Sequence, residues 1–92
     1  MKLIEILSIN LKYYRMHYNL SQEKFAEKVG SNLVYINELE NCKRKPTIEM
    51  LDKIAEGMNK NIDRKLKMTA SDLLKYDKTH RTTFNRIDEK KK

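Results

Sequence analysis

The chain has 92 residues, enough for one domain with a small core, and this size disfavours an enzyme with a deep catalytic cleft. Two glycines and one proline argue against a turn-rich β-sandwich, the single cysteine excludes an internal disulfide framework, and no apolar run is long enough to span a membrane. With 36% charged residues, the composition predicts a small all-α protein of the cytoplasm.

The net charge of +7 is concentrated in the last third of the chain. Residues 1–58 carry nine basic and eight acidic side chains, whereas residues 59–92 carry eleven basic and five acidic ones. A basic segment of this kind is typical of proteins that bind a polyanionic partner, and equally of a solubilising tail. The charge alone leaves both interpretations open.

Two of the predicted helices follow from apolar stripes at steps of three and four. The first covers residues 3–18, and the fourth begins after Pro46 and Thr47. The stripe of the first helix consists of Ile4, Leu7, Leu11, Tyr14 and Tyr18, and that of the fourth consists of Ile48, Leu51, Ile54, Ala55 and Met58.

Between these two, a pair of short helices is predicted over residues 22–29 and 33–40. Ser21 and Asn32 are suitable N-caps for them, and Gly30 suits the left-handed position that ends the first of the pair. Two helices joined by so short a turn must cross at a large angle. This is the geometry of a helix-turn-helix.

A fifth helix can be placed in two ways. In one, Asn61 and Ile62 open it; in the other, it follows Thr69, which forms a capping-box-like pair with Asp72 ahead of two leucines. We favour the second placement, because it gives the helix a cap and an apolar face.

The second placement leaves residues 59–66 as an insertion. Its simplest form is a lengthened fourth helix, and the alternative is a break at Gly57 and the polar run around Asn59–Asn61. Residues 1–76 then make one domain, and residues 77–92 a basic tail that is either mobile or a marginal helix. Several apolar side chains near this end are not fully covered by a four-helix core and predict a dimer contact. They are Ile62, Leu66, Leu73 and Leu74.

An ordered set of short motifs covers residues 11–58 with close to ungapped spacing. The set consists of Arg15, Leu20-Ser21-Gln22, Phe25-Ala26, Gly30, Tyr35-Ile36, Leu39-Glu40-Asn41, Pro46 and Leu51 with Ile54-Ala55. In this order the motifs resemble the Cro/cI-type (XRE) helix-turn-helix family. The resemblance implies a lambda-repressor-like bundle of about five helices that binds DNA, with the helix-turn-helix at residues 22–40.

The resemblance also implies which residues contact DNA phosphates. Free backbone N–H groups and the helix dipole at the start of the second helix favour a phosphate there, and a basic loop follows the third helix. The alternative for this loop is an ordinary solvated turn. The expected phosphate contacts are Ser21, Gln22, Asn41, Lys43, Arg44 and Lys45.

The third helix is expected to enter the major groove. There an asparagine can pair with adenine, a glutamate can accept from cytosine, and leucine or valine can touch a thymine methyl group. The residues expected at the bases are Asn32, Leu33, Val34, Asn37 and Glu38. Leu33, Val34 and Glu38 differ from the arginine, lysine, glutamine or serine common at these positions in the family. The alternative role of Leu33 and Val34 is packing against a partner protein.

The remaining candidates are given structural roles. Arg15 and Glu40 match the internal ion pair of the family, and Cys42 replaces its usual glycine, with redox sensing as the less favoured reading. His17 and His80 have no companions at metal-ligand spacing. The tyrosines at positions 13, 14, 18 and 35 are expected to pack rather than to stack on bases.

The sequence therefore predicts a sequence-specific DNA-binding transcriptional regulator, with no catalytic site, metal or cofactor. We expect a repressor that binds a pseudo-palindromic operator in double-stranded DNA as a homodimer. The alternative is an antitoxin or anti-repressor, which would use the same fold chiefly to bind a protein partner.

Overall fold

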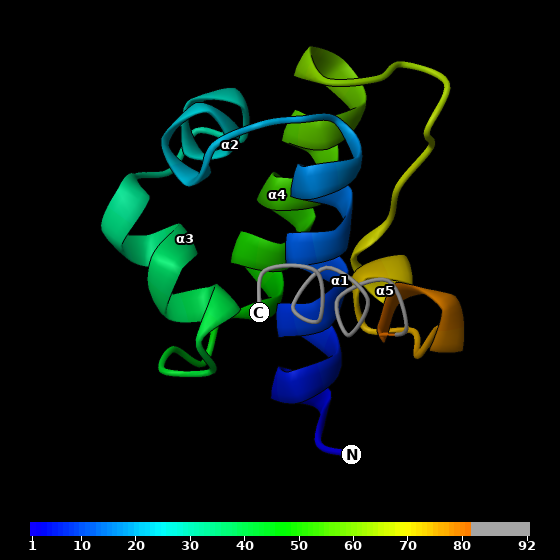
Figure 1. Ribbon diagram of the computed structural model, residues 1–92. Helices are drawn as coiled ribbons and strands as arrows, with labels where there is room; N and C mark the ends of the chain where they lie inside the picture. The colour runs from blue at the N-terminus through cyan, green and yellow to red at the C-terminus, as the bar shows by residue number, and fades with distance from the viewer. Residues whose placement is uncertain (82–92) are drawn as a thin grey trace, which may run out of the picture.

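The computed structural model describes residues 1–81, and the helices in this range confirm an all-α bundle (Figure 1). The helices are α1 (Leu3–His17), α2 (Gln22–Lys28), α3 (Leu33–Glu40), α4 (Ile48–Asn61) and α5 (Ala70–Leu73). α3 packs on α1 and α2, whereas α5 packs on α1 and α4. Figure 1 shows α2 and α3 on one side of the molecule and α5 on the other.

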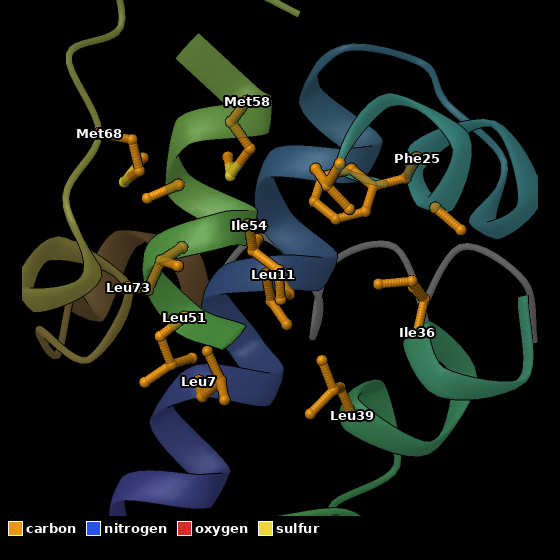
Figure 2. Close-up of a cluster of buried hydrophobic side chains, with 13 residues drawn as sticks. Leu7, Leu11, Phe25, Ile36, Leu39, Leu51, Ile54, Met58, Met68 and Leu73 are labelled. Carbon is orange, nitrogen blue, oxygen red and sulfur yellow. The ribbon is translucent and has the colours of Figure 1, made fainter. Parts of the chain in front are cut away.

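All five helices contribute to one apolar core (Figure 2). Side chains of α1 and α4 meet at its centre, and Phe25 from α2 fills the space next to α3. One residue of the predicted stripes is an exception, because Ile48 is 73% exposed at the first position of α4. The largest fully buried apolar side chains are Leu7, Leu11, Phe25, Ile36, Leu39, Ile54, Met58 and Leu73.

The first three helices end in the same way, with one residue in the left-handed backbone region. These residues are Asn19, Gly30 and Cys42, with φ angles of 55°, 72° and 60°. In each case the next N–H donates to the carbonyl five residues earlier, as in a Schellman motif. These bonds are Leu20 N to Arg15 O (2.9 Å), Ser31 N to Ala26 O (2.8 Å) and Lys43 N to Glu38 O (2.8 Å).

The prediction of a fourth helix that continues through Leu66 is wrong, because α4 ends at Asn61. The Asn59 side chain holds the returning chain, accepting from the Met68 N–H at 2.6 Å and donating to the Met68 carbonyl at 2.8 Å. Asp63 accepts from the Tyr18 hydroxyl at 2.9 Å. Burial and this hydrogen bond raise the pKa of Tyr18 to about 12.

The favoured placement of the fifth helix is confirmed. Thr69 Oγ1 accepts from the Asp72 N–H at 3.1 Å, and Asp72 Oδ2 accepts from the Thr69 N–H at 3.0 Å. However, Leu73 is fully buried rather than available for a dimer contact, because α5 lays it into the core. Leu74 is partly buried at the edge of this core.

Asn10 fixes the chain after α5 to the middle of α1. Its side-chain nitrogen donates to the carbonyls of Leu73 at 2.8 Å and Lys75 at 2.9 Å. Its oxygen lies 2.8 Å from Nδ1 of His80, and both side chains are buried. Because the Asn10 nitrogen donates, its oxygen must accept, so Nδ1 of His80 is the donor in this bond.

Within the expected tail, His80 packs against α1, and residues 82–92 lie outside the described residues. A helical turn begins at Lys78. The His80 ring stacks on Tyr13 with 3.7 Å between ring centroids. The packed bundle therefore includes His80, which composition alone placed in the tail.

Burial lowers the pKa of His80 from 6.5, although the nearby Asp77 carboxylate partly opposes this shift. Protonation of His80 thus favours the unfolded chain. The contribution of neutral His80 to folding stability is complete above about pH 6.5 and is lost as the pH falls below that value. We expect the free energy of unfolding, measured with urea, to be lower at pH 5.5 than at pH 7.5. His80→Gln should weaken this dependence, whereas His17→Gln should keep it. Equal pH dependence in wild type and His80→Gln would contradict this role.

Gly57 allows α4 to approach the end of α2. A Cβ atom at this position would lie 2.6 Å from the Val29 Cα atom and 3.1 Å from the Lys28 carbonyl oxygen. Alanine is favoured over glycine inside a helix by about 1 kcal/mol, but overpacking a rigid contact costs about 1–3 kcal/mol. Since the obstructing atoms belong to the backbone, we expect the steric cost to exceed the helix-propensity gain.

Gly57→Ala should therefore lower the free energy of unfolding in urea by about 1–2 kcal/mol. Glu56→Ala, at the exposed neighbouring position of α4, provides the control and should change stability by less than about 0.5 kcal/mol. A Gly57→Ala protein that is more stable than wild type would show that α2 and α4 can separate without cost.

Candidate nucleic-acid interface

Local hydrogen bonds set the relative orientation of α2 and α3. The Ser21 hydroxyl accepts from the Lys24 N–H at 3.0 Å, and Asn32 Oδ1 accepts from the Tyr35 N–H at 2.9 Å. Both are N-caps at the positions that the sequence predicts. Together with the left-handed Gly30, they produce a sharp turn between two short helices.

A polar network joins α1, α2 and α3 behind this turn. Arg15 donates from Nε and Nη2 to the two oxygens of Glu40, at 2.7 and 2.9 Å. Gln22 also donates to Glu40, at 3.2 Å, and its oxygen accepts from Asn37 Nδ2 at 3.1 Å. Since the Glu40 side chain is only 3% exposed, the network fixes the Gln22 side chain against the middle of α3.

The outer face of α3 combines apolar and polar side chains. Leu33 is 46% exposed and Val34 is 64% exposed, although both are large and apolar. Asn32 and Asn37 are also exposed on this helix, and Glu38 is half-buried. Figure 1 places α3 at the edge of the molecule, away from α5, so a duplex can approach this face.

The basic loop after α3 is organised by Glu38. Arg44 Nη2 donates to Glu38 Oε1 at 3.2 Å, and the Arg44 guanidinium lies 5.1 Å from the centroid of the Tyr35 ring. Lys43 and Lys45 are exposed and have no ion pair within residues 1–81. The loop therefore presents two free ammonium groups beside one guanidinium held by the helix.

The other candidate residues either make contacts within the protein or lie away from the outer face of α3. The Asn41 side chain donates to the Asn37 carbonyl at 2.8 Å, which closes the last turn of α3. Cys42 is exposed and occupies the left-handed position where the family usually has glycine. Tyr13 and Tyr14 pack around His80, on the side of α1 that faces the C-terminal segment.

Among residues 1–81, no group of three or more histidine, cysteine or acidic side chains is placed to hold a metal ion. No helix in the same range has the length and apolar character needed to cross a membrane.

Comparison with known proteins identifies the fold and the family. A helix-turn-helix family model matches residues 11–65, more than half of the chain. The chain belongs to the Cro/cI-type helix-turn-helix family of DNA-binding transcriptional regulators. Members of this family are regulators and not enzymes.

One relative is the control protein C.SmaI of Serratia marcescens, which is 36% identical over 66 residues, covering 72% of this chain and 79% of that protein. A solved structure, the hypothetical transcription factor NHTF from Neisseria, has a TM-score of 0.68 and is 20% identical. The match covers 90% of this chain and 85% of that one, and it shows that the two proteins share a fold.

Sequence reasoning missed two pairings at the interface of this family member. Glu38 and Arg44 are six residues apart across a helix end, so helical spacing gives no signal for their contact. Gln22 and Asn37 lie on different helices, and only the crossing angle brings them together. Their amide and charged side chains indicated that they would form hydrogen bonds or ion pairs, but the sequence did not indicate with which residues.

Proposed function

We propose that the protein is a sequence-specific transcriptional repressor that binds a pseudo-palindromic operator as a homodimer. The observation that carries the proposal is the position of the exposed face of α3 between the Gln22 side chain and the basic loop. Phosphate contacts on both sides would fix the register of α3 in the major groove. Because the described residues form a single bundle, repression by occupancy of the operator is the simplest mode of action.

The proposed phosphate contacts surround the proposed base contacts. The first set consists of Ser21, Gln22, Asn41, Lys43, Arg44 and Lys45, and the second consists of Asn32, Leu33, Val34, Asn37 and Glu38. Within the first set, the Ser21 hydroxyl is already used as an N-cap, so Gln22 and the loop cations have the stronger roles.

Self-association is supported by an apolar face beside the basic loop, whose Lys45 and Pro46 line the same hollow as Leu3 and Ile48. Leu3 is 61% exposed and Ile48 is 73% exposed, and both line one shallow hollow with Leu74. We propose that a second copy docks on this face, because two α3 helices on one duplex raise both affinity and specificity.

Selection of bound sites from random double-stranded DNA, using the full chain, tests the proposal. We expect an inverted repeat whose half-sites are about 34–36 Å apart, or about one helical turn. In sedimentation, Ile48→Glu should yield monomers, and glutamate at the first position of α4 is compatible with the helix. Enrichment of no sequence would contradict DNA recognition, and enrichment of a single half-site would contradict the dimer.

A second candidate function is that of an antitoxin or anti-repressor that binds a protein through α3. The exposure of Leu33 and Val34 favours it, because large apolar side chains at the surface often mark protein contacts. The ratio of absorbance at 260 and 280 nm of the purified protein separates the two functions at low cost. Co-purified nucleic acid supports the first candidate.

A further inference from the structure

The polar side chains on the outer face of α3 already have hydrogen-bond partners within the protein. Asn32 Oδ1 caps α3, and Asn37 Nδ2 donates to Gln22. Glu38 Oε1 accepts from Arg44 at 3.2 Å. A bidentate contact from Asn32 to adenine needs both the oxygen and the nitrogen of the amide, and its oxygen is engaged at the cap.

The side chains on this face without such commitments are apolar. Leu33 and Val34 occupy the first turn of α3, with 46% and 64% of their surfaces exposed. In a helix-turn-helix, the N-terminal residues of the recognition helix are those that contact base edges. The side chains best placed to contact bases therefore carry no hydrogen-bonding group.

We infer that Leu33 and Val34 recognise the C5 methyl groups of pyrimidines in the major groove. This inference rests on the proposed DNA-binding function and names the feature of the duplex that α3 reads. The charges beside α3 favour this partner over a protein, because Lys43 and Lys45 are exposed and unpaired in the described residues and attract phosphate.

Methyl recognition has a chemical consequence that a hydrogen-bonding readout lacks. Thymine and 5-methylcytosine carry a methyl group at the same ring position, whereas uracil and cytosine have hydrogen there. Burial of one methyl group corresponds to about a fourfold change in the dissociation constant. The protein should therefore distinguish thymine from uracil, and 5-methylcytosine from cytosine, at the same positions of its site.

The experiment uses the full chain and the site selected from random DNA. Each thymidine of a half-site is replaced in turn by deoxyuridine, which keeps the O4 acceptor and loses only the methyl group. We expect about fourfold weaker binding at one or two positions of the half-site and no change elsewhere. At those positions, a 5-methylcytosine–guanine pair should bind better than a cytosine–guanine pair by a similar factor.

Two variants connect this discrimination to α3. The Leu33→Ala/Val34→Ala protein, which changes exposed residues only, should bind thymine and uracil sites equally well. Tyr76→Ala removes a comparably exposed apolar side chain, 48% exposed after α5, and should keep the fourfold ratio. Thermal melting of all three proteins shows that they are folded.

The outcomes separate the inference from the proposed function. If the protein binds its selected site and uracil is equivalent to thymine at every position, the methyl readout is wrong and DNA recognition stands. A discrimination that persists in the double alanine variant also overturns the assignment to Leu33 and Val34. If no DNA is selected, both proposals fail, and the apolar pair is better explained by a protein partner.

Discussion

Glu40→Ala is expected to lower the free energy of unfolding by about 3–5 kcal/mol. The Glu40 side chain is 3% exposed and receives two hydrogen bonds from Arg15, whose own side chain is 15% exposed. Without the carboxylate, the guanidinium would remain largely buried beside α3 with no opposite charge. Urea unfolding followed by circular dichroism measures the effect, and Arg15→Ala should be destabilised to a similar degree for the same reason.

The exposed pair of Lys24 and Glu27 provides the control for this prediction. Their charged atoms are 3.4 Å apart, and their side chains are 68% and 67% exposed. Because water screens such a pair, Glu27→Ala should cost less than about 1 kcal/mol. Equal stability of Glu40→Ala and Glu27→Ala would show that the Arg15–Glu40 pair does not hold α3 against α1.

The elements that the sequence predicted well are those defined by local interactions. The caps at Ser21, Asn32 and Thr69 each involve a hydrogen bond three residues away, so their positions can be found from residue types and spacing. The left-handed end at Gly30 follows from its residue type in the same way. These local signals place the starts of α2, α3 and α5 and the end of α2.

The features that escaped prediction depend on contacts between distant parts of the chain. Asn10 and His80 are 70 residues apart in sequence, and no periodicity connects them. The apolar residues after Met58 continue the stripe of α4, yet the helix stops because Asn59 binds the returning chain at Met68. In both places the structure depends on side-chain contacts between segments that are distant in sequence.

The same distinction applies to the candidate interface. The family pattern predicts Gln22, Arg44 and Glu38 as interface residues, but it does not predict that each is held by another side chain. Arg44 in particular is shared between Glu38 and any phosphate it contacts. Its contribution to DNA binding therefore depends on the loop as a whole, so the three basic residues of the loop are best replaced together.

Replacement of Lys43, Arg44 and Lys45 together by glutamine should weaken binding to all DNA sequences and reduce its salt dependence. Each phosphate contact contributes about 0.9 to the slope of log K against log salt concentration, so loss of three contacts lowers its magnitude by up to about 2.7 per chain. The preferred site should not change, because phosphate contacts carry no direct sequence information. Fluorescence anisotropy titrations at several salt concentrations measure both quantities.

A matched variant removes the same charge from the other end of α4. Lys60, Arg64 and Lys65 are exposed and lie near or beyond the C-terminal end of this helix, whereas the basic loop precedes its first residue. Changing these three to glutamine alters the net charge equally, but should leave most of the salt dependence in place, because screening limits the reach of a charge to about 8–10 Å. An equal loss of slope in both variants would mean that net charge, rather than contact by the basic loop, determines affinity.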